Sequence, residues 1–389
     1  MPTIVGIPRE TFPGERRVAL IPRQCEALRK AGVEMVVEYG AGGEAGFPDE
    51  AYAARGARLA SRADVFREAH IVAQVRCLGA NPDAGRLDLE LFRFGQAVAG
   101  FGEPLTAVRE CAELADAGVS FFSIELMPRI TRAQSMDALS SMATISGYRA
   151  VLLGASELPK MFPMLMTAAG TITPARVFVL GAGVAGLQAA ATARRLGAIV
   201  SAYDVRPAVK EQVESVGAKF VTLDVDAGGS EDKGGYAKAM DEAFYRRQRQ
   251  LMTEVLREQD VVITTAAVPG KRAPILITAE MVGAMCAGSV IVDIAAERGG
   301  NCELTQPGET VAHHGVTVLG PLNLPSLVPY HASQMYSCNI AAFLRLLVRD
   351  GNLTVNLDDE IVRETLVAHE GKIVNARISE LLAEQAARI

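Results

Sequence analysis

The sequence has few histidines, no paired cysteines and no long apolar run. Its 389 residues include five histidines and six cysteines, and the cysteines form no Cys-x-x-Cys pair. Such scattered cysteines argue against a zinc site and against a disulfide framework, so we expect reduced, mostly buried thiols and no metal. No apolar stretch reaches the roughly eighteen residues of a spanning helix, and the start resembles a strand rather than a signal peptide. We expect a cytoplasmic chain.

Charge of one sign is not concentrated anywhere along the chain. The net charge is −6, with 22% charged and 49% apolar residues. Without a basic patch, nucleic acid is not an expected partner. The composition is that of a globular protein, and the length is sufficient for two domains with separate cores.

A glycine-rich run follows the apolar stretch at residues 177–180. It places Gly181, Gly183 and Gly186 at the spacing of a dinucleotide site, and Asp204 ends the next apolar run. The first glycine allows a tight turn, the second allows the backbone to approach a pyrophosphate, and the third allows the following helix to pack closely. The phosphates would then lie at a helix N-terminus.

The context of this run strengthens the interpretation. A helical pattern at 184–196 follows the glycines, and a second strand at 199–203 leads to the acid. Asp204 can accept hydrogen bonds from the adenosine ribose and would repel a 2′-phosphate, which favours NAD(H) over NADP(H). Arg206 is open to two interpretations: a 2′-phosphate ligand, or a solvated or adenine-stacking side chain beside the carboxylate. The second fits the acid better.

Apolar runs and helical patterns alternate along the whole chain. This alternation predicts two α/β domains, each a Rossmann-like, doubly wound parallel sheet, joined by two crossings with a cleft between them. A helix at about 137–153 would bridge the domains, and a helix at about 332–349 would return to the first. The domains are expected at 1–136 with 327–389, and at 137–326. The expected strands are residues 5–7, 35–39, 71–75, 97–101 and 119–124, then 177–180, 199–203, 219–221, 261–264, 290–293 and 316–319.

A polar segment at 222–236 separates the third and fourth strands of the second domain. It is acidic and contains two Gly-Gly pairs, with Tyr236 at its far end. A loop of this length is usually disordered or a lid. The single aromatic residue favours a lid that closes over a ligand, and plain surface disorder is the alternative.

Polar side chains gather between a strand end at residue 124 and the bridging helix. Arg129 and Asp137 could form an ion pair that fixes this loop, while Gln134 and Ser140 offer neutral hydrogen-bonding groups for a carboxamide. Strand C-termini face the ligand crevice of α/β domains, which favours a position opposite the nicotinamide. Helix capping with solvated arginines is the structural alternative.

Several motifs together resemble the NAD(H)-binding component of proton-translocating nicotinamide nucleotide transhydrogenase. The resemblance covers almost the whole chain. Its motifs lie at residues 6–10, 14–20, 129–141, 166–177, 203–206, 234–238 and 299–302.

The resemblance implies a set of residues for the NAD(H) site. It implies catalytic positions for Gln134, Arg129 and Asp137 at the nicotinamide. The cofactor-binding residues that it implies are Arg129, Ile130, Thr131, Arg132, Gln134, Ser140, Gly181, Gly183, Val184, Gly186, Asp204, Val205, Arg206, Gly235, Tyr236 and Ala267.

The resemblance also implies an activity and partners. In that family, hydride passes directly from NADH to NADP⁺ on a partner subunit, and a membrane-spanning subunit couples this transfer to proton translocation. The family component is a homodimer, peripheral on the inner face of the membrane. Because this chain ends at Ile389, it resembles the form in which the membrane portion is a separate polypeptide.

Alanine dehydrogenase shares the opening pattern and is the alternative enzyme, while an NAD-sensing module is the non-enzyme alternative. Where alanine dehydrogenase has a lysine and a histidine, this sequence has Arg76 and the run 100–103. Arginine cannot exchange a proton near neutrality, whereas hydride transfer between nicotinamides needs no acid or base. Arg17, which matches a carboxylate ligand of alanine dehydrogenase, is then expected to form an ion pair.

Overall fold

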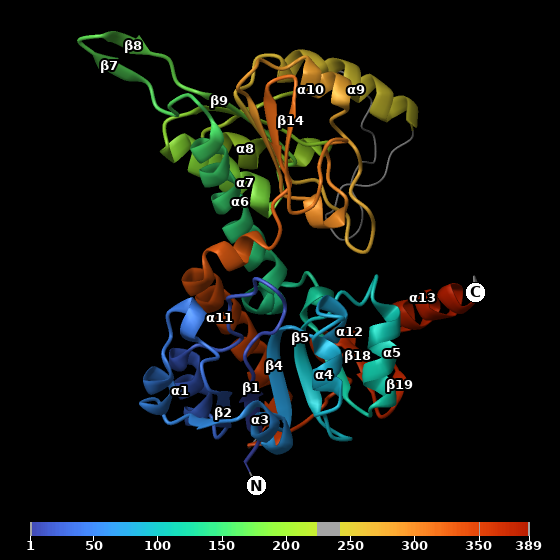
Figure 1. Cartoon of the computed structure of the whole chain (residues 1–389). Helices are drawn as coiled ribbons and strands as arrows, with labels where there is room; N and C mark the ends of the chain where they lie inside the picture. Colours follow the sequence, from blue (N-terminus) through green and yellow to red (C-terminus); the bar gives the residue numbers. More distant parts are fainter. Residues whose placement is uncertain (1, 224–241, 350, 388–389) are drawn as a thin grey trace. The chain divides into compact units, whose positions relative to one another are not determined.

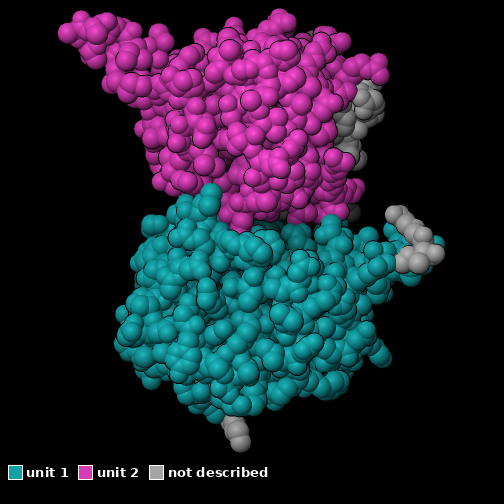
Figure 2. Space-filling view, viewed as in Figure 1, with its two compact units in different colours: residues 1–142, 326–389 teal, residues 143–325 magenta. Residues whose placement is uncertain are grey.

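The chain folds into two compact α/β units. The computed structural model describes residues 2–223, 242–349 and 351–387. Unit 1 comprises Met1–Met142 and Ser326–Ile389, and unit 2 comprises Ala143–Pro325 (Figures 1 and 2). The chain passes between them within helix α6 (Ala138–Glu157) and again within the short helix η7 (Leu324–Leu327).

Unit 1 is built on an eight-stranded sheet in the order β19-β18-β6-β5-β4-β1-β2-β3. The six strands from β6 to β3 are parallel, and β18 joins β6 antiparallel. The strands are β1 Ile4–Ile7, β2 Glu34–Glu38, β3 Arg58–Ala60, β4 Ile71–Arg76, β5 Ala97–Phe101, β6 Ser120–Ser123, β18 Leu366–His369 and β19 Lys372–Ile373. The helices are α1 Pro22–Lys30, α2 Asp49–Ala53, α3 Arg62–Glu68, α4 Gly85–Leu89, α5 Val108–Asp116, α11 Pro329–Leu347, α12 Glu360–Thr365 and α13 Ala376–Ala386.

Alternating side chains of this sheet supply two apolar layers. Val98 and Phe121 pack with the apolar face of α5. On the neighbouring strand position, Phe122 points to the opposite face and meets Phe343 of α11, with ring centroids 5.6 Å apart. Burial on both faces explains why these strands are continuous apolar runs in the sequence.

Unit 2 is built on a seven-stranded sheet in the order β11-β10-β9-β12-β13-β15-β14, in which the six parallel strands repeat the order of those in unit 1 and β14 joins β15 antiparallel. Its strands are β9 Arg176–Leu180, β10 Ile199–Tyr203, β11 Lys219–Phe220, β12 Val261–Thr264, β13 Val290–Asp293, β14 Thr310–His313 and β15 Val316–Leu319. Its helices are α7 Val184–Arg195, α8 Lys210–Ser215, α9 Glu242–Leu256 and α10 Ala279–Gly283. A separate hairpin pairs β7 Leu165–Thr167 with β8 Gly170–Ile172 (Figure 1).

The core of unit 2 also lies on both faces of its sheet. Val177 and Val179 pack with alanines of α7 and with residues of α6 on one face. Phe178 and Leu180 pack with α9 and α10 on the other face. The period-two alternation of β9 therefore divides the sheet into two buried layers.

The predicted fold class, two α/β units with mostly parallel sheets, is confirmed. The expected cleft between the units stays a prediction. The expected helix at 332–349 begins three residues earlier, because Pro329 occupies its first position, where its missing N–H costs nothing. Among the described residues, no helix combines the length and the apolar character that crossing a membrane requires.

Candidate functional site

The turn between β9 and α7 has three glycines with three different constraints. Gly181 has a φ of +101°, a backbone conformation that residues other than glycine rarely adopt. A Cβ on Gly186 would lie 1.8 Å from the carbonyl oxygen of Gly181, so only glycine lets the helix approach the turn. A Cβ on Gly183 would meet no protein atom within 4 Å.

Open space at Gly183 is what a phosphate-binding turn requires. Gly183 is the N-cap of α7, and no side chain caps the helix there. The first-turn N–H groups of a helix lack partners within the helix and favour an anion. The residues present therefore fit a dinucleotide pyrophosphate, with Val184 half exposed beside the turn.

Asp204 lies at the end of β10 and is 8% exposed. Its Oδ2 accepts the N–H of Ala182 at 2.8 Å, which ties the acid to the glycine-rich turn. Arg206 donates to both carboxylate oxygens, with Nε 2.9 Å from Oδ1 and Nη2 3.0 Å from Oδ2. Arg206 is therefore paired with the acid rather than solvated, and its expected stacking on adenine stays a prediction. Val205 between them is half-buried.

The loop after β12 lies directly against the glycine-rich turn. The hydroxyl of Thr265 donates to the carbonyl oxygen of Gly181 at 3.0 Å. Ala267, two residues further on, is exposed. In a doubly wound sheet the ligand lies where the strand order reverses, and here that point is between β9 and β12. Thr265 was not predicted as a site residue, although its position directly after the expected strand 261–264 could have indicated it.

In unit 1, Glu125 fixes the start of the loop that carries Arg129 and Gln134. Its carboxylate accepts the N–H groups of Gly102 at 3.0 Å and Glu103 at 2.7 Å, at the end of β5. Burial, and then the nearby charge of Glu103, raise the pKa of Glu125 from 4.5 to about 7. Glu125 was not predicted as a site residue, although it connects two strand ends.

Asp137 caps the N-terminus of helix α6. Its Oδ1 accepts the N–H of Ser140 at 2.9 Å and its Oδ2 accepts the hydroxyl of Ser140 at 2.6 Å. Both oxygens of Asp137 thus accept hydrogen bonds at the helix N-terminus, and the expected ion pair with Arg129 stays a prediction. Arg129 and Gln134 are exposed.

Arg132 forms a bidentate ion pair with Asp359, both contacts at 2.7 Å. Asp359 is also the N-cap of α12, so this pair attaches the loop to the C-terminal segment of unit 1. Its neighbours Ile130 and Thr131 are half-buried and exposed, respectively. The predicted residues from 129 to 140 thus belong to unit 1, and those from 181 onward belong to unit 2. Gly235 and Tyr236 lie outside the described residues, as does nearly all of the expected lid.

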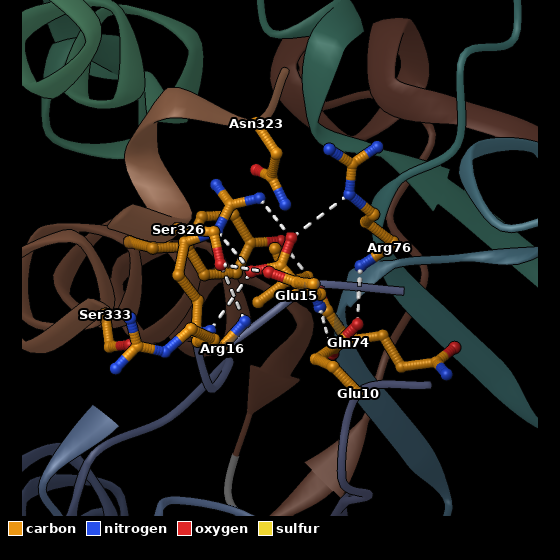
Figure 3. A network of polar contacts seen from close by, with 12 residues as sticks. Glu10, Glu15, Arg16, Gln74, Arg76, Asn323, Ser326 and Ser333 are labelled. Atoms are coloured by element: carbon orange, nitrogen blue, oxygen red, sulfur yellow. Dashed lines mark hydrogen bonds and ion pairs between the residues drawn. The ribbon is translucent and has the colours of Figure 1, made fainter. Parts of the chain in front are cut away.

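Unit 1 also contains a buried charged cluster (Figure 3). Arg17 donates to Glu15 through Nε at 2.7 Å and Nη2 at 2.6 Å, which confirms the expected ion pair. Arg76 reaches the same carboxylate at 3.1 Å. Burial alone would raise the pKa of Glu15, but the two arginines outweigh it and lower the pKa to about 2.

Glu10 belongs to the same cluster, and its pKa is shifted in the opposite direction to that of Glu15. Burial, and then the charge of Glu15, raise the pKa of Glu10 from 4.5 to about 8. Its oxygens accept the N–H groups of Val75 at 2.6 Å and Arg76 at 3.0 Å, at the end of β4. A raised pKa favours the protonated form of Glu10 near neutrality, and Glu15, Arg17 and Arg76 together then carry a net charge of +1.

Comparison with known proteins agrees with this geometry. Residues 6–146 match the family model described as alanine dehydrogenase/PNT, N-terminal domain, and residues 150–376 match its C-terminal domain. The chain is 46% identical over 379 residues to an NAD(P) transhydrogenase subunit alpha polypeptide of Rhodospirillum rubrum, covering 96% of this chain and 98% of that protein. The chain belongs to the family of NAD(P) transhydrogenase alpha subunits.

Solved structures and more distant relatives support this assignment. A transhydrogenase structure from Sinorhizobium meliloti is 43% identical and has a TM-score of 0.86, covering 95% of this chain and all of that chain. An alanine dehydrogenase from Halomonas elongata is 30% identical over 385 residues, 97% of this chain and 96% of that protein. The transhydrogenase relatives are thus the more similar of the two groups.

Proposed function

We propose that this chain binds NAD(H) in unit 2 and acts in direct hydride transfer from NADH to NADP⁺, which is held by a partner subunit. The observation that carries the proposal is the turn at Gly181–Gly183–Gly186 joined to Asp204 by the Ala182 N–H. When bound, NADH supplies the hydride; it is oxidised and NADP⁺ is reduced.

The side chains assigned to the cofactor divide by function. Helix α7 and Gly183 would hold the pyrophosphate, and Asp204 would accept the adenosine ribose hydroxyls. A 2′-phosphate beside this carboxylate would be repelled, so a calorimetric titration should show tighter binding of NADH than of NADPH. We place Arg129, Asp137 and Ser140 at the nicotinamide, and Ala267 beside it on the loop after β12.

Gln134 is the residue that we assign to ring positioning. Its side chain is exposed, and its neutral amide can orient a carboxamide without supplying a proton. The reaction needs no acid or base. The buried arginines of unit 1 suit this requirement, because Arg17 and Arg76 are held by Glu15 and cannot exchange a proton near neutrality.

The proposed assembly contains two copies of this chain, an NADP(H)-binding subunit and a membrane-spanning subunit. Peripheral attachment to the inner membrane face and coupling to proton translocation follow from those partners. The hairpin β7–β8 supports a dimer. Met166 and Ile172 of the hairpin are 79% and 40% exposed, and Met164 directly before it is 58% exposed, an apolar surface suited to a second copy.

Rapid mixing of the NADH-loaded chain with the NADP⁺-loaded partner subunit tests the reaction. We expect hydride transfer with the wild type, and at least about tenfold slower transfer with Gln134→Asn at unchanged NADH affinity. Shortening the side chain displaces groups that must lie roughly 3–3.5 Å apart. Gln212→Asn, an exposed glutamine on α8, is the matched control.

Three outcomes would contradict the proposal. A wild-type rate for Gln134→Asn would remove that residue from ring positioning. Absence of transfer in the wild type, together with NADH oxidation on addition of pyruvate and ammonia, would instead indicate an alanine dehydrogenase. Binding of NADH with neither activity would leave the NAD-sensing module.

A further inference from the structure

In the motif at residues 299–302, the buried side-chain amide of Asn301 is hydrogen-bonded to the loop after β12. Asn301 is 0% exposed. Its Oδ1 accepts the N–H of Ala266 at 2.9 Å, while its Nδ2 donates to the carbonyl oxygens of Ala266 at 2.8 Å and Pro274 at 2.9 Å. One side chain thus binds both ends of the segment 266–274, in the way that a neighbouring strand would.

Asp293 holds Asn301 in place from the end of β13. It is 0% exposed, and its Oδ2 accepts the N–H of Asn301 at 2.7 Å and the hydroxyl of Thr305 at 2.7 Å. Its Oδ1 accepts the hydroxyl of Thr264 at 2.8 Å, at the end of β12. Gly300 makes this approach possible, because its φ is +79° and a Cβ there would lie 2.7 Å from Oδ2.

The loop that Asn301 holds, residues 265–274, lies on the opposite side of the dinucleotide turn from Asp204. Asp204 on β10 marks the adenosine side of β9, and β12 lies on the opposite side. A dinucleotide with its pyrophosphate at α7 therefore extends its nicotinamide half toward β12 and the loop that follows. Thr265, next to Ala266, already contacts Gly181.

We propose that Asn301, oriented by Asp293, is a positioning residue that fixes the loop 265–274 at the nicotinamide half of the NAD(H) site. This proposal rests on the proposed function, since it assumes that unit 2 binds NAD(H). It assigns no contact between Asn301 and the cofactor. The loop backbone that Asn301 holds would make that contact.

Asn301→Asp is the most direct test, because it replaces the donating amide group with a carboxylate oxygen and leaves the side-chain volume almost unchanged. The carboxylate would face the carbonyl oxygens of Ala266 and Pro274 without a hydrogen to donate, which should release the loop. We expect the Kd for NADH to rise at least about tenfold, and the Kd for ADP to change less than about twofold. ADP contains the adenosine and pyrophosphate but no nicotinamide half, so its binding also shows that unit 2 is folded.

A second readout and a control separate positioning from general destabilisation. The fluorescence of the bound dihydronicotinamide should move toward that of free NADH in Asn301→Asp, because the ring is no longer held. Asn81→Asp changes an equally buried amide in unit 1, 2% exposed and bonded to Thr11, and should leave both affinities unchanged.

Each outcome decides between the two proposals. If the wild type fails to bind NADH, the proposed function and this inference both fall. If the wild type binds NADH and Asn301→Asp weakens NADH and ADP equally while remaining folded by circular dichroism, only the inference falls. Should Asn301→Asp not fold, Thr305→Val removes one donor from Asp293, and an unchanged ratio of the NADH and ADP affinities in that variant overturns the inference.

Discussion

Arg206 illustrates how a single side chain can prepare a ligand site. In unit 2 it neutralises the buried carboxylate of Asp204, while the Ala182 N–H holds the same group against the glycine-rich turn. A buried carboxylate without such partners is costly. We expect the ribose hydroxyls to take over the oxygens that Arg206 now contacts, so that the arginine becomes free to lie over the adenine.

Glu10 leads to a prediction about pH and stability. Its pKa is raised to about 8 in the folded chain, against 4.5 ordinarily, so the folded state binds more protons between these values. The contribution of Glu10 to the free energy of unfolding is therefore fully present below about pH 4.5 and is lost as the pH rises through about 8. Glu10→Gln resembles the protonated form, so its midpoint of urea unfolding should fall less than that of the wild type between pH 5 and pH 8.

The control for this experiment is Glu50→Gln, which changes an exposed glutamate of α2. It should retain the wild-type pH dependence. Glu125, with a pKa of about 7, contributes in the same direction and should leave a residual slope in Glu10→Gln. If the urea midpoint changes with pH by the same amount in Glu10→Gln and in the wild type, Glu10 is ionised in the folded chain.

At the scale of elements, the strand β9, its turn and helix α7 lead to a prediction that separates folding from binding. Gly183→Ala meets no protein atom within 4 Å and has an ordinary φ of −76°, so its stability should match that of the wild type. The added methyl group would occupy the space for phosphate, and the Kd for NADH should rise at least about tenfold.

Gly186→Ala is the matched comparison on the same helix. Its Cβ would lie 1.8 Å from the carbonyl oxygen of Gly181, so α7 must move away from the turn. We expect a loss of about 1–3 kcal/mol in the free energy of unfolding together with weaker NADH binding. Thermal unfolding and calorimetric titration measure the two effects. Normal NADH binding by Gly183→Ala would contradict the assignment of this turn to phosphate.

The same elements show what could be predicted from the sequence. The buried parallel strands are short apolar runs, and β5, β10, β12, β13 and β15 have the predicted bounds. The edge strands β3 and β14 and the antiparallel pair β18–β19 were not predicted, because they are only two to four residues long and are selected by pairing with other strands. The bond between Arg132 and Asp359 spans 227 positions, so no local pattern could indicate it.

For the candidate site, the glycine-rich turn and Asp204 could be predicted because their spacing follows from backbone geometry. The polar contacts that fix the adjoining loops could not. Glu125, Asn301 and Asp293 are ordinary polar residues in the sequence, and their partners include backbone groups of other strand ends and loops. Only the folded sheet brings these groups together.

At the scale of the whole molecule, the two units share a strand order but differ at the point where it reverses. In unit 2 this point contains Gly181 and Thr265. In unit 1 the equivalent strands are β1 and β4, and the carboxyl group of Glu10 bridges them by accepting the N–H groups of Val75 and Arg76. A carboxyl side chain thus connects the two strand ends in unit 1, whereas in unit 2 the glycine-rich turn follows β9. We therefore assign one dinucleotide to each chain.

The hairpin β7–β8 gives a prediction for the assembled molecule. An isolated two-stranded hairpin is marginally stable in water, and this one exposes Met166 at 79% on a strand with no third neighbour among the described strands. Contact with a second copy would bury this surface and stabilise the hairpin.

Met166→Glu should therefore weaken the proposed dimer at least about tenfold, because a carboxylate would be transferred from water into an apolar contact. Sedimentation velocity over a range of concentrations measures this change, with NADH binding as a check on folding. Leu87→Glu, at a position 68% exposed in unit 1, should leave the dimer intact. If Met166→Glu sediments like the wild type at every concentration, the hairpin is not the surface that joins two copies.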